Sequence, residues 1–226
     1  MKYRIVALAA LVLTTFAPAA WALGKGTSML AIELIHGTAD YADKLTAGSG
    51  PGPADYITAW EHSEGGFQAQ YWYMMSEDYA LTLTAGFGSF WETDKPGQGA
   101  VAGSPDLEFN TNSYNLRIGG DRVGKIGERT IMYGGPGIEF WSGHATFKPD
   151  PFAATPTGEY KNQNTTRIGL SARIGATMLI GDGWGLTTHV GGRYGYASTE
   201  EDGAKATWTP SSIEASAGVL WMFGGQ

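Results

Sequence analysis

The residues of this chain that could do chemistry are ionisable side chains placed inside otherwise apolar, alternating segments. Three glutamates, three arginines and one histidine share this setting: Glu33, Arg117, Glu139, Arg173, Arg193, Glu214 and His189. Such a set allows two interpretations, a path for ions or protons and a structural network of salt bridges. An unpaired buried charge is costly, so charges that share one interior must pair. We therefore predict that the three arginines pair with the three glutamates and close that interior.

A serine nucleophile activated by a histidine and oriented by an acid is the second chemistry to consider. The histidines of the chain are His36, His62, His144 and His189. None is followed two residues later by a serine on the same strand face. Ser142 and His144 do share a face in the reverse order, but Glu139 has the opposite parity and points the other way. We therefore predict no catalytic site.

Metal and cofactor sites are the third possibility. His62 lies between Glu61 and Glu64, a spacing that matches no recognised ligand pattern. The glycine-rich stretches 86–88 and 134–137 lead into no helix, so they do not have the features of phosphate-binding loops. The chain also has no cysteine. These observations predict neither a metal ion nor a cofactor.

The elements that must position the charged residues are clearest in residues 166–196. Even positions from 166 to 180 are mainly apolar, and odd positions carry glycine, hydroxyl groups and arginine. After Gly181-Asp182-Gly183 the alternation resumes and continues to residue 196. A period of two across such a turn predicts a β-hairpin. Its strands are longer than is usual in soluble sheets and match a tilted crossing of a bilayer.

The same alternation recurs along the chain. It predicts strands at about 28–38, 66–75, 79–91, 107–120, 128–142, 166–180, 184–196 and 211–223. Long connections (39–64, 92–106, 143–162, 197–210) alternate with short turns (76–78, 121–127, 181–183). Pro136 among glycines predicts a bulge or bend in the fifth strand. An even number of strands with this alternation predicts an all-β fold, an eight-stranded antiparallel up-and-down transmembrane β-barrel.

The two faces of the predicted strands differ in size and polarity. Eight tilted strands enclose a lumen just wide enough for side chains. Large apolar residues share one face, which we predict to contact lipid, and the charged residues share the lumenal face. Aromatic residues gather near strand ends, as interface anchoring requires. The predicted aromatic girdle consists of Tyr71, Tyr73, Tyr79, Trp184, Tyr194, Tyr196, Trp221 and Phe223.

The first 22 residues have the features of a secretory signal peptide. Lys2 and Arg4 precede an apolar stretch, and Ala20-Trp21-Ala22 forms a cleavage site. Residues 23–226 are then predicted to form one barrel domain. Removing Lys2 and Arg4 from the 15 basic residues leaves 13 against 22 acidic residues, a formal charge of −9. Such an acidic balance argues against a nucleic acid as partner.

With this topology and alternation, the chain resembles the OmpA/OmpX-type family of small outer-membrane β-barrels. The ending Val219-Leu220-Trp221-Met222-Phe223 looks like the aromatic C-terminal signal read by the bacterial barrel-assembly machinery, although Gly224-Gly225-Gln226 follow the phenylalanine. The resemblance implies the outer membrane of a Gram-negative bacterium. It also implies contact with outer-membrane lipid and lipopolysaccharide, and with the barrel-assembly machinery during biogenesis.

We therefore predict a non-enzymatic barrel of structural or surface-interaction type, with its lumen plugged by ion pairs. Two alternatives stay open. One is an outer-membrane enzyme that hydrolyses acyl bonds of lipid A or phospholipid, and the other is a narrow pore for small hydrophobic molecules. No extracellular partner can be named from the residues.

Overall fold

The computed structural model describes residues 23–41, 60–94, 107–148, 161–181, 183–201, 204–209 and 211–224. Within these ranges every regular element is a β-strand. The described residues include no helix of the length and apolarity needed to cross a membrane. The predicted signal peptide, residues 1–22, lies outside the described residues. So do residues 42–59, 95–106 and 149–160 of the predicted long connections and Asp182 of the predicted turn 181–183.

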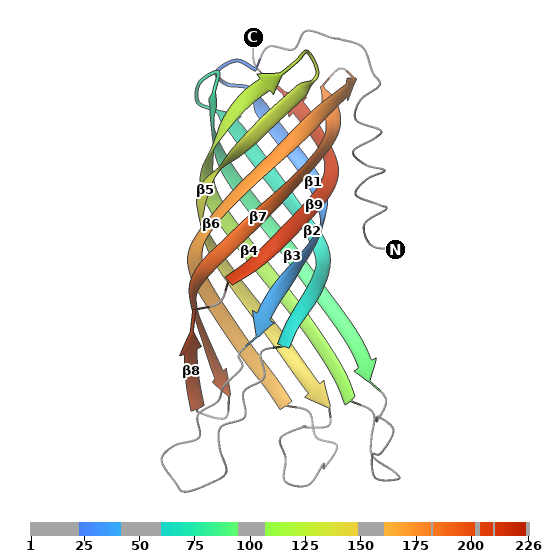
Figure 1. The fold of residues 1–226 in the computed structure, drawn as a ribbon, viewed down its shortest axis with the longest axis vertical. Coiled ribbons are helices and arrows are strands. Elements are labelled where there is room, and N and C mark those ends of the chain that lie inside the picture. Colours follow the sequence, from blue (N-terminus) through green and yellow to red (C-terminus); the bar gives the residue numbers. More distant parts are fainter. Residues whose placement is uncertain are drawn as a thin grey trace, which may run out of the picture.

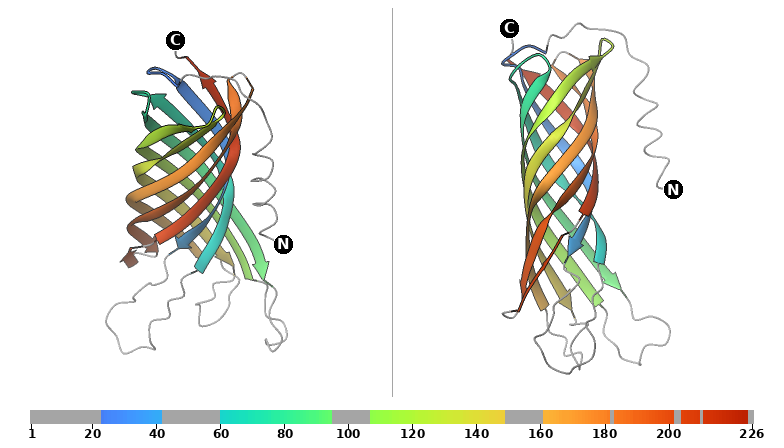
Figure 2. Two further views of the ribbon diagram at one scale, coloured as in Figure 1. Left: turned by 45° about the horizontal axis from the view of Figure 1, so that its top comes forward. Right: turned by 60° about the vertical axis from the view of Figure 1, so that its left-hand side comes forward.

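The strands form a closed antiparallel ring. They are β1 (Ser28–Tyr41), β2 (Trp60–Met74), β3 (Tyr79–Asp94), β4 (Leu107–Ile126), β5 (Thr130–Lys148), β6 (Lys161–Gly181), β7 (Trp184–Glu201), β8 (Ala204–Trp208) and β9 (Ser211–Phe223). Each of β1 to β7 pairs with the next, β7 pairs with β9, and β9 pairs with β1. Eight strands thus close the barrel, and all are inclined to its axis in the same sense (Figures 1 and 2). The predicted fold class is confirmed.

Most strands extend beyond the predicted bounds. Tyr41 faces Trp60 and Asp94 faces Leu107, so the predicted long connections contain strand residues at their ends. At the opposite end of the barrel β4 continues to Ile126, and the turn occupies residues 127–129. The predicted turn at 121–127 is therefore wrong. An antiparallel hairpin can lengthen in register without disturbing either face, and polar residues do not prevent it when they point into a polar lumen.

The predicted connection 197–210 is also too long, because it contains β8. Ala197 of β7 faces Trp208 of β8, and Tyr194 of β7 faces Ser211 of β9. The two pairings keep one register, so β8 and β9 are two parts of one strand. β8 ends at Trp208 and β9 begins at Ser211. The intervening sequence contains a proline, a residue type that cannot donate to a ladder.

The glycine-rich segment of β5 disturbs the barrel wall less than predicted. Gly119 of β4 faces Gly137 of β5, and Arg122 faces Gly134, so the register is the same on both sides of Pro136. The two rungs between these pairs are missing from the β4–β5 ladder, while pairing with β6 is continuous. The predicted bulge or bend is therefore a local interruption without a register shift.

Side chains alternate between the outside and the lumen along each strand. Outward residues include many large apolar side chains, among them Leu34, Phe67, Ile138, Leu170 and Ile213, all of which are exposed by more than half. The inward residues include buried threonines, glutamines, glutamates and arginines. A soluble barrel would place these groups the other way round. The distribution suits a wall surrounded by acyl chains and a lumen filled by polar side chains.

Candidate functional site in the lumen

All seven predicted lumenal residues point inward. Glu33 lies on β1, Arg117 on β4, Glu139 on β5, Arg173 on β6, His189 and Arg193 on β7, and Glu214 on β9. The six other than Arg193 are at most 8% exposed, and the Arg193 side chain is 12% exposed. Their positions follow from the strand register, which for example sets Arg117 opposite Glu139 and Glu33 opposite Gly218. The register alone does not decide which of them touch.

Asp121 is the main acidic partner of two arginines, although the sequence pattern predicts it in a turn. Its carboxylate is fully buried and accepts hydrogen bonds from Arg173 Nη2 at 2.7 Å and from Arg173 Nε at 3.2 Å. Arg117 Nη2 lies 3.7 Å from the other carboxylate oxygen, and Trp72 Nε1 donates to Asp121 at 3.0 Å. Arg117 also donates to the hydroxyl oxygens of Ser171 and Thr82. The prediction that Arg117 and Arg173 pair with glutamates therefore did not include Asp121, which is the partner they share.

The basic side chain nearest to Glu33 is a histidine rather than an arginine. His189 Nδ1 lies 3.5 Å from Glu33 Oε1, and His189 Nε2 lies 3.5 Å from Glu214 Oε1. The amide nitrogens of Gln68 and Gln70 both donate to Glu33. Both amides donate to Oε2, and among the described residues Oε1 has only the His189 ring nitrogen at 3.5 Å as a basic neighbour, so the amides partly replace a guanidinium partner. The predicted arginine partner for Glu33 is not seen.

Arg193 joins two carboxylates nearer the long-connection end of the barrel. Its Nε lies 3.0 Å from Glu139 Oε2, and its Nη2 donates to Glu214. Arg167, outside the predicted set, lies 3.7 Å from Glu139 and stacks over Trp141 with its guanidinium carbon 5.4 Å from the ring centroid. Arg167 shares the odd phase of β6 with Arg173, so the alternation could have identified it.

The network crosses the whole width of the barrel. Arg173 on β6 donates a hydrogen bond to Gln70 on β2. These strands are four positions apart in either direction around the ring of eight, so this contact spans a diameter. Gln70 also lies within 3.2 Å of His189, which connects the Asp121 group to the Glu33 group. The network thus contains four arginines and four carboxylates among the described lumenal residues, with His189 between two of the carboxylates.

An apolar layer adjoins the network and fills the lumen at the end where the short turns lie. It consists of Leu23, Met29, Ala31, Trp72, Met74, Ala80, Val123, Ile131, Tyr133, Leu179 and Leu220. Trp72 and Tyr133 meet edge to face, with ring centroids 5.3 Å apart. The alternation pattern does not identify this layer, because both strand phases are apolar there. Runs such as Tyr71-Trp72-Tyr73-Met74 are the only signal in the sequence.

Ser216 and His189 form a pair that the search along single strands could not detect. They face each other on β9 and β7, and Ser216 Oγ lies 2.7 Å from His189 Nδ1. With Glu214 on the other ring nitrogen, the three have the composition of a hydrolytic triad. Ser216 is only 5% exposed and faces the charged lumen, whereas acyl chains lie outside the wall. We therefore interpret the three residues as part of the network.

The other chemical candidates lie elsewhere. His144 is exposed on the outer face, and its Nδ1 lies 2.7 Å from Asn164 Oδ1. Glu139, the nearest acid in the sequence, is buried on the opposite side of the wall. The side chain of His62 lies outside the described residues. Within the described ranges no group of three or more histidines, aspartates or glutamates is placed to hold a metal ion.

The aromatic residues assigned to the girdle are all exposed on the outer face, in two bands. Tyr71, Tyr73, Tyr79, Trp184, Trp221 and Phe223 lie near the short-turn ends of their strands, and Tyr194 and Tyr196 lie toward the other end of β7. Trp184 faces Trp221 across the β7–β9 pair. The Tyr79 ring lies over Gly120, where any side chain would collide with the tyrosine hydroxyl.

Comparison with known proteins shows likeness at the level of structure. No family model matches the sequence, and no curated protein matches it. Two solved structures resemble it over nearly their whole length. OprG, an outer membrane protein of Pseudomonas aeruginosa, is 15% identical with a TM-score of 0.51, over 89% of this chain and 98% of that one. A major outer membrane protein of Thermus thermophilus is 12% identical with a TM-score of 0.50, over 86% of this chain and 99% of that one.

A third structure is that of Ail, the attachment invasion locus protein of Yersinia pestis, in complex with the heparin analogue sucrose octasulfate. It is 14% identical with a TM-score of 0.50, over 88% of this chain and 99% of that one. At these identities the likeness concerns the fold. The resemblance suggested by the strand pattern is thereby confirmed: the chain has the fold of the small eight-stranded outer-membrane β-barrels.

Proposed function

We propose that this protein is a non-enzymatic β-barrel of the Gram-negative outer membrane, of structural or surface-interaction type, with a lumen closed by ion pairs. The observation that carries the proposal is the contact between Arg173 and Gln70 across the full diameter of the barrel. The apolar layer around Trp72 lies between this contact and the short-turn end of the barrel, and it forms a second barrier to water and ions. These two features support a lumen that is closed to solutes.

The two alternatives receive less support. A pore for small hydrophobic molecules would need an apolar passage, whereas the middle of the lumen is lined by charged side chains. A lipid hydrolase would need its nucleophile on the lipid side of the wall, and Ser216 is on the lumenal side. Among the described side chains, the acid nearest in sequence to the outward Ser142 and His144 is Glu139, and it points into the lumen.

Purified protein reconstituted in lipid separates these functions. We expect almost no current in a planar bilayer and no release of fatty acid from phospholipid or lipid A vesicles. A large, stable conductance would contradict the proposal that ion pairs close the lumen, and it would favour the pore. Fatty acid release that disappears in Ser216→Ala or in Ser142→Ala would overturn the non-enzymatic assignment, and Ser89→Ala, on the outer face of β3, serves as the control.

The proposed orientation places the short turns in the periplasm and the long connections outside the cell. The outer half of the wall would then contact lipopolysaccharide, and the β9 ending would be the part read by the barrel-assembly machinery. Protease added to intact cells should cut within 42–59, 95–106 or 149–160 and spare the turns at 75–78 and 127–129. Cleavage at the short turns in intact cells would reverse the orientation.

A further inference from the structure

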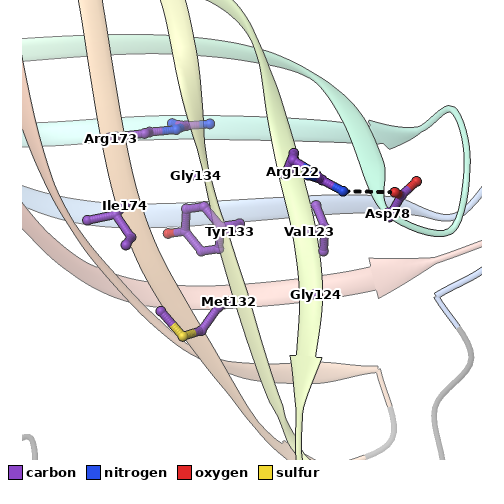
Figure 3. A pocket seen from close by; sticks show the side chains of 9 residues that line it. All are labelled: Asp78, Arg122, Val123, Gly124, Met132, Tyr133, Gly134, Arg173 and Ile174. Carbon is purple, nitrogen blue, oxygen red and sulfur yellow. Dashed lines mark hydrogen bonds and ion pairs between the residues drawn. The ribbon is translucent and has the colours of Figure 1, made fainter.

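A pocket of about 510 Å³ lies on the outer face of the barrel near its short-turn end. Figure 3 shows the side chains around it, which come from the β2–β3 turn, β4, β5 and β6. Met132 and Ile174 are its apolar side chains. Gly124 faces Met132 across the β4–β5 pair, and Gly134 faces Ile174 across the β5–β6 pair. The absence of side chains at these outward glycines makes the wall hollow at this point. The missing rungs of the β4–β5 ladder lie beside the same hollow.

The edge of this pocket carries one positive and one negative side chain. Arg122 Nη2 lies 3.5 Å from Asp78 Oδ2, and the two side chains are 84% and 65% exposed. The dashed line in Figure 3 marks this pair. The turn that holds Asp78 is attached to β4, because Val123 N donates to Asp78 O at 2.9 Å. Both charges are therefore held at the edge of an apolar hollow, with most of each side chain accessible to a ligand.

The Asp78 carboxylate is ionised at neutral pH. The Ser76 hydroxyl donates to Asp78 Oδ1 at 2.9 Å, and this hydrogen bond, together with Arg122, holds the Asp78 pKa below its usual value. A ligand that carries only negative charge meets repulsion from this carboxylate, and one that carries only positive charge meets repulsion from Arg122. A headgroup with a phosphate next to an ammonium group complements both.

We propose that this pocket binds a zwitterionic glycerophospholipid with a primary ammonium headgroup. The phosphate contacts Arg122, the ammonium group contacts Asp78, and one acyl chain lies over Gly124 and Gly134, against the side chains of Met132 and Ile174. The proposal rests on the proposed orientation, which places this end of the barrel in the periplasmic leaflet, where the lipid source is phospholipid.

The test measures lipid binding to folded protein in a neutral detergent by native mass spectrometry. The lipids are phosphatidylethanolamine, phosphatidylglycerol, phosphatidylcholine and lipid A, added separately at matched concentrations. We expect phosphatidylethanolamine to bind best to the unmodified protein. Phosphatidylcholine should bind less well, because its quaternary ammonium cannot donate a hydrogen bond to Asp78. Equal binding of all four lipids, or tighter binding of phosphatidylglycerol or lipid A, would overturn the proposal.

Charge variants locate the binding to the pocket. Arg122→Gln removes a charged donor to the phosphate and should weaken phosphatidylethanolamine binding about tenfold. Asp78→Asn should remove the preference for phosphatidylethanolamine over phosphatidylglycerol. Lys125→Gln is the matched control, because Lys125 is exposed on the same strand and does not line the pocket. If Lys125→Gln and Arg122→Gln weaken phosphatidylethanolamine binding equally, the attraction to the hairpin is nonspecific and the proposed site is wrong.

A steric variant tests the acyl part of the site. A Cβ added at Gly124 meets no other heavy atom within 4 Å, so we expect Gly124→Leu to fold normally and to fill the hollow. Gly192 on β7 is also outward and open, and Gly192→Leu is its control. Gly124→Leu should reduce binding severalfold and Gly192→Leu should not. If the folded, non-conducting barrel binds phosphatidylethanolamine equally in both variants, the site is wrong while the proposed function stands.

Discussion

The two faces of β6 give adjacent residues very different surroundings. Ala172 and Arg173 are adjacent, yet Ala172 is exposed on the outer face and Arg173 is buried among Asp121, Gln70 and Thr84. On the outer face a charge has no partner within lipid. In the lumen a charge is held by several polar groups from other strands, and removing one partner leaves the rest unsatisfied. The cost of a substitution should therefore depend on the face more than on the position along the strand.

The largest effect is expected on the lumenal face. Arg173→Ala leaves the buried Asp121 carboxylate with Arg117 at 3.7 Å as its remaining cationic neighbour. We expect a loss of about 3–5 kcal/mol in the free energy of unfolding, measured by denaturant titration in detergent or vesicles. The same substitution at the exposed Lys125 is the control and should change little. Equal effects at both positions would contradict a network that depends on pairing.

The next effect is expected on the lipid face. Ala172→Arg places a charge among acyl chains and should cost about 2–4 kcal/mol of unfolding free energy in vesicles. Ile126→Arg, at the outward end of β4 beside the turn, should cost far less. Ser171 is one residue away and points into the lumen, where Arg117 donates to its Oγ at 2.9 Å. Ser171→Arg should therefore prevent folding by crowding the lumen against Arg117. A neutral Ala172→Arg would reverse the assignment of the two faces.

A double-mutant cycle measures how strongly two lumenal residues, Arg193 and Glu214, depend on each other. Arg193→Met and Glu214→Gln each remove one member of a buried pair, whereas the double variant removes both members and leaves Glu139 with Arg167 at 3.7 Å. The two changes should be non-additive by about 0.5–3 kcal/mol, so the double variant costs less than the sum of the single ones. Glu214→Gln combined with the distant Asp78→Asn should be additive. Additivity in the first cycle would show that Arg193 and Glu214 do not pair.

The smallest effect is expected at the exposed pair outside the lumen. Asp78 and Arg122 are both largely solvated, so Asp78→Asn should leave the unfolding midpoint at neutral pH nearly unchanged. The pKa of Asp78 is lowered in the folded state, chiefly by the Ser76 hydrogen bond. Any stabilisation is therefore present above the ordinary pKa and is lost as the pH falls through the folded-state value. A difference between the two proteins that grows in acid would contradict this sign.

Much of the architecture could be predicted from the residues themselves. The alternation in 166–196 identifies the β6–β7 hairpin and separates the lumenal Arg173 and Arg193 from the outward Leu170 and Tyr194. This works because successive side chains of a strand point to opposite faces, a property of the local backbone. The strand ends were predicted less well, since polar residues such as Asp121 resemble turn residues when their surroundings are unknown.

The residue pattern alone specifies the barrel, its two faces and most of the side chains that enter the lumen. Only the tertiary structure shows which of these side chains are in contact. The pairs are Asp121 with Arg173, His189 with Glu33, and Gln70 with Arg173 across the barrel. The physical reason is that these partners lie on strands two to four positions apart around the ring. Their contacts depend on the inclination and register of all eight strands and on the reach of each side chain, and no local pattern contains that information.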